Sequence, residues 1–266
     1  MLKDILESLF CLFPIFYCGV RNFCRSHDWE KQVFLRTIKP GWSVIDVGAN
    51  QGYYTNFFLK LIRQKGVVHA FEPIPSAFQI LKNKVKYKKN CFIHNVGVSS
   101  KNEVAQFFSP IEDSGKTSMK AHSCKLWNSL QKQIINSKVI RIDDFYPLQK
   151  LTKIDLIKID TEGAELLVLK GAMETIKKNK PTIIFEACKE CMKSFDYSVN
   201  DLDNFFSDLD YSNFRIVNIS QNTNYSKFDL RINLPGKKHR FIRDLKIPLN
   251  GLHNIRNATA ASAVSL

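Results

Sequence analysis

The chain has 266 residues, 44% of them apolar and 12% aromatic, with a formal net charge of +14 at pH 7. The apolar content supplies a sizeable core and excludes an intrinsically disordered protein, and the length suits one domain of about 200 residues with extensions at its ends. Nucleic acid is not the expected partner, because no basic motif of a nucleic-acid-binding module occurs.

An apolar segment, Leu9–Val20, lies near the N-terminus and contains Pro14. It is too short to span a bilayer, and it lacks the basic start and the cleavage site of a signal peptide. Two interpretations stay open: peripheral contact of residues 9–20 with a membrane, flanked by Arg21 and Arg25, or a helix that packs on the domain or on another subunit. We expect a cytoplasmic protein, which this segment could bring to a membrane.

The seven cysteines are odd in number and irregularly spaced, which does not indicate a disulfide framework. Cys188 and Cys191 form a C-x-x-C motif. A zinc site would need a second ligand pair at matching spacing, and the sequence shows none. Unpaired thiols are therefore expected, with a redox pair as the alternative.

From residue 43 onward, short apolar strands alternate with helical patterns. This alternation predicts an α/β fold with a mainly parallel, seven-stranded sheet and helices on both faces. The expected strands are 43–47, 67–71, 91–96, 155–159, 182–185, 214–219 and 228–232, and the direction of the last one, parallel or antiparallel, stays open. The expected helices are 53–63, 73–88, 164–177 and 200–209.

The alternation breaks between residues 97 and 142, where expected strands at 104–108 and 139–142 flank a polar loop, 113–125. Long loops in compact domains are often functional. The expected division is an apolar N-terminal extension over 1–38, the α/β domain over 39–235, and a partly frayed extension over 236–266.

A glycine turn follows the first expected strand, with Gly48 and Gly52 four residues apart. In an open α/β fold, this places a ligand over a helix N-terminus. Glu72, at the end of the second strand, can accept hydrogen bonds from both hydroxyls of a ribose. The middle glycine that a dinucleotide pyrophosphate requires is missing. S-adenosylmethionine fits better, because Asp46 offers a negative charge near its sulfonium and amine.

Polar side chains also end the other expected strands. They are Asn95, the pair Asp160 and Glu162, and Glu186. The carboxyl ends of parallel strands meet at one edge of a sheet, so these groups should line one crevice with Asp46 and Glu72.

Three segments resemble the FkbM family of methyltransferases: residues 44–55 (VIDVGANQGYYT), 69–73 (HAFEP) and 157–165 (IKIDTEGAE), with 95–99 and 169–172 in agreement. The resemblance implies a Rossmann-like class I methyltransferase fold that uses S-adenosylmethionine, with methyl transfer to a hydroxyl of a sugar, as in glycan biosynthesis, or of another small molecule. By that resemblance the cofactor loop comprises Asp46, Gly48, Asn50 and Gly52, with Glu72 at the ribose and Asn95 or Val96 at the adenine.

Asp160 and Glu162 are the candidates for the base that activates the acceptor hydroxyl. They could instead stabilise the N-terminus of the following helix. No metal is expected, although Asp160, Glu162 and Glu186 could together hold a divalent cation. His94 and His122 are alternative bases. The rival functions are an NAD-dependent sugar-modifying enzyme and a non-catalytic binding protein on a methyltransferase fold; the oligomeric state stays open.

Overall fold

The computed structural model describes residues 29–122, 127, 129–186, 188–221, 226–233, 240–247 and 261–265. The apolar segment 9–20 lies outside these residues. Within them, no helix is long and apolar enough to cross a membrane.

The main sheet contains nine strands in the order β11-β10-β9-β12-β8-β7-β1-β2-β3. Five neighbouring strands, called the central strands below, run parallel and end at the edge strand β3: β1 (Ser43–Val47), β2 (Val67–Phe71), β3 (Cys91–His94), β7 (Leu156–Ile159) and β8 (Thr182–Phe185). Four antiparallel strands extend one edge: β9 (Tyr211–Gln221), β10 (Ser226–Asn233), β11 (Arg240–Ile247) and β12 (Ala261–Ser265). The chain proceeds outward from β1 to β3 and returns to β7 on the other side of β1, so the topological switch point lies between β1 and β7.

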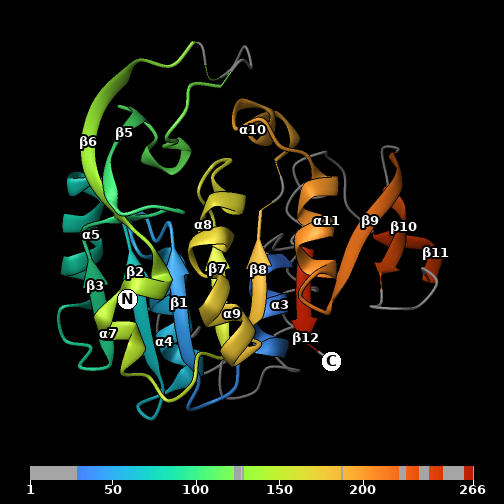
Figure 1. Ribbon diagram of the computed structural model, residues 1–266, viewed down its shortest axis with the longest axis horizontal. Helices are drawn as coiled ribbons and strands as arrows, with labels where there is room; N and C mark the ends of the chain where they lie inside the picture. The colour runs from blue at the N-terminus through green and yellow to red at the C-terminus, as the bar shows by residue number, and fades with distance from the viewer. Residues whose placement is uncertain are drawn as a thin grey trace.

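Helices cover both faces of the sheet (Figure 1). The helices are α3 (Trp29–Thr37), α4 (Tyr53–Ile62), α5 (Pro75–Val85), α7 (Tyr146–Gln149), α8 (Glu165–Gly171), α9 (Met173–Asn179), α10 (Lys189–Ser194) and α11 (Val199–Ser207). Successive side chains of a strand point to opposite faces. Accordingly, Val44 packs in a core cluster with α3, α4 and α5, whereas Ile45 packs in a second cluster with α8, α9 and α11.

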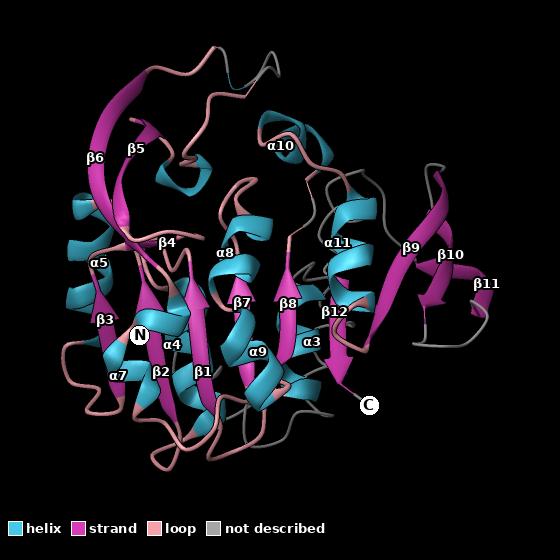
Figure 2. Ribbon diagram, in the orientation of Figure 1, coloured by secondary structure: helices cyan, strands magenta, loops and turns pink. Residues whose placement is uncertain are grey.

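A second, smaller sheet stands beyond the carboxyl ends of the central strands (Figure 2). It consists of β4 (Gly97–Val98), β6 (Lys132–Ile140) and β5 (Glu103–Pro110), in that order. Phe107 and Val139 from this sheet pack on Ile74 and Ala77 at the start of α5. This contact fixes the second sheet over the strand ends, where the crevice was expected.

The Rossmann-like α/β class is confirmed, and so are the bounds of β1, β2 and β8. The expectation of seven strands was too low, because β11 and β12 come from residues assigned to the C-terminal extension. The domain boundaries themselves remain predictions.

Three elements differ locally. The helix expected over 164–177 is two helices that meet at Ala172, where Gly171 packs so closely on Ser99 that a Cβ would overlap its carbonyl oxygen. β6 begins at Lys132 rather than at 139, because residues 132–138 pair with β5. Most of these residues are not buried, so the sequence shows no apolar signal for them. The short helix α10 was not predicted.

Candidate active site

An open cleft lies at the carboxyl ends of β1, β2 and β7, next to the switch point, and encloses about 650 Å³ including space open to solvent. The lining includes Gly48, Asn50, Glu72, Asp160 and Thr161 from the main sheet, and Phe107, Ser114, Gly115, Thr117 and Met119 from the second sheet and its loop. The position agrees with the rule that open α/β sheets bind ligands outside the carboxyl ends of their strands.

The glycine turn forms one wall of this cleft. Gly48 has a φ of 75°, and a Cβ at this position would overlap the backbone carbonyl oxygen of Asp160. Its N–H and that of Ala49 donate to the carbonyl of Phe71 at 3.1 and 3.0 Å. Gly52, with a φ of 76°, precedes α4 and packs on Leu81, so it shapes the turn without lining the cleft.

Glu72 joins the end of β2 to the glycine turn. One carboxylate oxygen accepts from the backbone N–H of Asn50 at 2.7 Å, and the other from that of Ile74 at 2.8 Å. Each oxygen keeps a second lone pair with which it can accept from a ligand hydroxyl. Burial raises the pKa of Glu72 to about 7, despite the opposing effect of the two hydrogen bonds.

Asp46 does not line the cleft. It was expected to face a cationic ligand, but its side chain is fully buried beside the ammonium of Lys158, at 3.6 Å. Its other oxygen accepts from the hydroxyl of Thr55 at 2.6 Å. Burial raises the pKa of Asp46, and Lys158 opposes that rise.

Lys158 on β7 is a residue of this site that the sequence reasoning missed. Its ammonium donates to Asp160 at 3.1 Å and to the carbonyl of Gly48 at 3.3 Å. It is 5% exposed. A buried lysine between two acids therefore ties the glycine turn to the acidic end of β7. The only available signal was a cation placed in an otherwise apolar strand.

Asp160 and Glu162 lie in the turn between β7 and α8. Asp160 lines the cleft, whereas Glu162 does not, although it lies next to both Asp160 and Glu186. Burial, together with the charges of Asp160 and Glu186, raises the pKa of Glu162 to about 8. A carboxyl with this pKa holds its proton at neutral pH, so Asp160 is the better candidate for a base.

The buried carboxylate of Glu165 stabilises this turn through hydrogen bonds. One of its oxygens accepts from the backbone N–H groups of Thr161 and Gly163 and from the hydroxyl of Thr161, at 3.0 to 3.2 Å. The other accepts from the phenol of Tyr197 at 2.9 Å. This support permits the positive φ values of Glu162 and Gly163, 51° and 107°.

The remaining candidates lie outside the cleft lining. The Asn95 amide donates to the carbonyl oxygens of Glu72 and Pro73 at 2.8 and 3.3 Å. His94 stacks on His69, and burial lowers the pKa of His94 to about 4. The ring of His122 is buried, with Nδ1 3.2 Å from the hydroxyl of Ser194.

The loop between β5 and β6 reaches over the cleft, as its polar character suggested. Ser114 donates to the side-chain oxygen of Asn50 at 2.8 Å, and Ser118 donates to the carbonyl of Glu162 at 2.8 Å. The loop thus bridges the glycine turn and the acidic turn, two segments that are distant in sequence.

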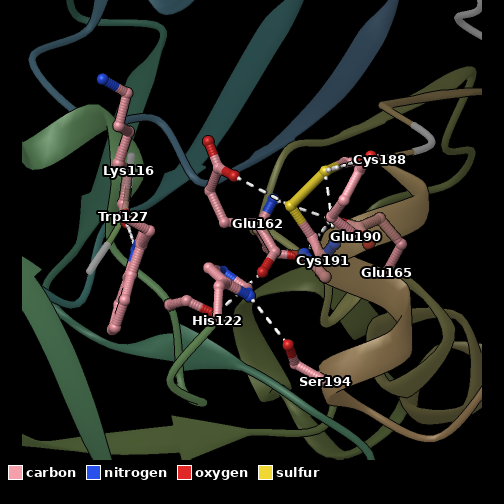
Figure 3. The surroundings of a disulfide bond; sticks show 12 residues. Lys116, His122, Trp127, Glu162, Glu165, Cys188, Glu190, Cys191 and Ser194 are labelled. Carbon is pink, nitrogen blue, oxygen red and sulfur yellow. Dashed lines mark hydrogen bonds between the residues drawn. A yellow bond between two sulfur atoms is a disulfide. The ribbon is translucent and has the colours of Figure 1, made fainter. Parts of the chain in front are cut away.

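Cys188 and Cys191 form a disulfide, which corrects the expectation of unpaired thiols (Figure 3). Cys188 is the N-cap residue of α10, and its sulfur lies 3.3 Å from the backbone N–H of Cys191. The first turn of the helix therefore brings the two sulfurs together.

The fold and the cleft define a Rossmann-like α/β protein with a ligand site at the strand ends. Residues 46–212 match the model of the methyltransferase FkbM domain, which is more than half of the chain. The chain belongs to the FkbM methyltransferase family. Its class I methyltransferase fold was thus inferred correctly.

The individual relatives either have low sequence identity to this chain or match only a short part of it. The 2-O-methyltransferase NoeI of Sinorhizobium fredii is 27% identical over 176 residues, 61% of this chain and 70% of that protein. A 55-residue stretch, 21% of this chain, is 62% identical to 12% of the UDP-N-acetylmuramate–L-alanine ligase of Pelagibacter ubique. The crystal structure of an FkbM methyltransferase from Methylobacillus flagellatus has a TM-score of 0.45 and 20% identity, covering 68% of this chain and 45% of that one.

Proposed function

We propose that the protein is an S-adenosylmethionine-dependent O-methyltransferase that acts on a hydroxyl of a sugar, a glycan or a related small molecule. The observation that carries the proposal is the cleft, which has Glu72 and the glycine turn on one side and Asp160 on the other, in a chain of the FkbM family. The name of NoeI, a 2-O-methyltransferase, supports oxygen as the acceptor atom.

The residues present fit this cofactor. The missing side chain at Gly48 leaves the turn close to the strand end, and Glu72 retains lone pairs for ribose hydroxyls. Asp46 has no direct part in this proposal, because it lies under the turn against Lys158. Gly52 shapes the turn, and Asn95 connects the end of β3 to the end of β2 through its hydrogen bonds.

S-adenosylmethionine, when bound, supplies a methyl group on a positively charged sulfur. Because the acceptor oxygen must approach in line with the bond that breaks, positioning supplies much of the rate. Asp160 is placed to accept the proton that the hydroxyl loses, and its bond to Lys158 fixes the orientation of its carboxylate. Residues of the second sheet and of its loop line one side of the cleft.

Calorimetry with S-adenosylhomocysteine tests the cofactor assignment. We expect micromolar-class binding by the wild type and loss of at least about tenfold in affinity for Glu72→Ala, which removes hydrogen bonds to a charged acceptor. Thermal protection by S-adenosylhomocysteine but not by NAD would separate the proposal from the dehydrogenase alternative. Protection by NAD alone would overturn it.

Transfer of a labelled methyl group to a panel of saccharides tests the acceptor class. Asp160→Asn should lose about a hundredfold or more in rate, a typical contribution of a general base, while it retains S-adenosylhomocysteine affinity. Asp144→Asn is the matched control, since that carboxylate is bonded to Arg141 and Asn102 outside the cleft. Binding without transfer to any acceptor would favour a non-catalytic protein.

A further inference from the structure

Three potential metal ligands from separate segments meet beside the disulfide (Figure 3). They are His122 from the loop between β5 and β6, Glu162 from the turn after β7, and Cys191 from α10. One ligand atom from each lies within 4.8 Å of the other two. The sulfur of Cys191 is 3.5 Å from a carboxylate oxygen of Glu162. The cluster borders the cleft but does not line it.

His122 provides an independent sign of a ligand. Its side chain is only 4% exposed, and Nε2 is buried without a well-formed hydrogen bond to any described residue, although the ring is close enough to the backbone of Glu162 for that contact to raise its pKa against the effect of burial. A buried polar atom without a partner is costly and uncommon. Its other ring nitrogen lies 3.2 Å from the hydroxyl of Ser194, and the ring packs edge-on against Trp127. Metal-binding histidines have this arrangement, with one nitrogen fixed and the lone pair of the other available.

The donor set selects the class of cation. Imidazole, thiolate and carboxylate together suit Zn²⁺ and similar transition-metal ions. Mg²⁺ and Ca²⁺ prefer oxygen ligands alone. C-x-x-C motifs often supply two sulfur ligands to one zinc ion, and here His122 and Glu162 are the second ligand pair that the linear sequence did not show.

The disulfide blocks this site in the structure, because a bonded sulfur is not a thiolate ligand. We infer that reduction of the Cys188–Cys191 bond creates a site for one Zn²⁺-class cation, held by His122, Glu162 and the thiolates of Cys191 and Cys188. The site goes beyond the proposed methyl transfer and does not depend on it.

The redox step requires a two-electron reductant: a dithiol, or in the test tube a phosphine, which takes its oxygen from water and becomes a phosphine oxide. With a dithiol, one thiolate attacks a sulfur of the disulfide and releases the first cysteine as a thiolate. The second thiolate of the reductant then attacks the resulting mixed disulfide and releases the second cysteine. Two electrons and two protons pass to Cys188 and Cys191, while the dithiol becomes a disulfide. The cation then displaces the two thiol protons, since the thiolate is the metal ligand.

Titration of the full chain with Co²⁺, a coloured substitute for Zn²⁺, tests the inference. The protein is first reduced with a phosphine in the absence of oxygen. We expect about one equivalent of Co²⁺ to bind with a thiolate-to-cobalt charge-transfer band that Zn²⁺ then removes. The oxidised protein should show no such band. This comparison requires no mutation, so a variant that fails to fold cannot obscure it.

Variants locate the ligands. Cys191→Ser should abolish the band, and His122→Gln should weaken binding at least about tenfold, in the range found when metal sites are perturbed. Cys91→Ser is the matched control, because Cys91 is a free cysteine on β3. Circular dichroism checks the fold of each variant. Absence of the band in reduced wild type, or its persistence in Cys191→Ser, would overturn the inference. S-adenosylhomocysteine affinity of the same samples reports separately on the proposed function.

Discussion

The two ends of the cleft are held together by different interactions. At the glycine-turn end, residues 48–52 and Glu72, each oxygen of a buried carboxylate accepts a backbone N–H. At the acidic end, residues 160–165 and Glu186, the charges of neighbouring carboxylates act on Glu162. The first end is a satisfied hydrogen-bond network within two adjacent strands. The second is electrostatically unfavourable, which is typical of functional sites.

Lys158 connects the two ends, and its loss should give the largest effect. Lys158→Met leaves Asp46 fully buried without its cation. Breaking a buried ion pair typically costs about 3–5 kcal/mol, and we expect a loss of that size in urea denaturation. Lys153→Met is the control, because Lys153 is 66% exposed and pairs with Asp155 at the surface. Equal stability of the two variants would show that Lys158 does not hold the ends together.

Gly48→Ala tests the glycine-turn end alone. A Cβ there would overlap the carbonyl of Asp160 at a φ of 75°, and strain at such positions costs about 1–3 kcal/mol. We expect a loss at the upper end of that range, with weaker S-adenosylhomocysteine binding. Gly41→Ala has a similar φ, 90°, but nothing within 4 Å of the added Cβ, so it measures the backbone strain without the overlap. If Gly48→Ala and Gly41→Ala lose the same stability, the contact of Gly48 with the Asp160 carbonyl does not constrain the turn.

Tyr197→Phe tests the acidic end. It removes the hydrogen bond to Glu165, the residue that supports the turn at 161–163. Hydrogen bonds to charged groups contribute about 1.5–3 kcal/mol, and we expect a loss near the lower value together with slower methyl transfer at unchanged cofactor affinity. Tyr211→Phe is the control, since its phenol donates to the carbonyl of Pro181 away from the cleft. A loss of turnover in both variants would argue against a specific role for the turn.

The pH dependence of cofactor binding should give the smallest effect. Burial raises the pKa of Glu72 from an ordinary value of 4.5 to about 7. A ribose hydroxyl donates to the carboxylate form, so S-adenosylhomocysteine affinity should fall, by up to about tenfold per pH unit, as pH decreases below 7. Glu72→Gln should flatten this dependence in calorimetry at pH 6, 7 and 8. A wild-type affinity that is constant across this range would contradict the assignment.

Folding stability should depend on Glu72 in the opposite direction. Between pH 4.5 and about 7 the folded state holds the Glu72 proton while the unfolded state releases it. This contribution therefore makes the wild type lose stability as pH rises through that window. Glu72→Gln should lack this contribution, and thermal denaturation at pH 5 and 8 compares the two proteins.

The sequence by itself determined the central sheet and the glycine-turn end. Short apolar runs that alternate with helical patterns specify parallel strands buried on both faces, and such runs are a local property of the chain. The Gly48–Gly52 turn is likewise local, and the position of Glu72 follows from the parallel pairing of β1 with β2. The main errors lay outside this part of the molecule. The length of β6 depends on its pairing with β5, and at the break between α8 and α9 Gly171 packs on Ser99, which is distant in sequence.

The sequence had already brought Asp160, Glu162 and Glu186 together, but only the tertiary structure decided which residues surround and support this acidic end. In the sequence, Lys158 is a single charge within an apolar strand. In the folded structure, packing places it against Asp46 and Asp160. His122 and Cys191 are 69 positions apart in the chain, and they meet at Glu162 because the second sheet and α10 both extend over the strand ends. Such convergence depends on contacts between distant segments, and these contacts produce no periodic pattern or motif in the sequence. Strands and turns, in contrast, depend on residues that are neighbours in the chain, so the sequence predicts them.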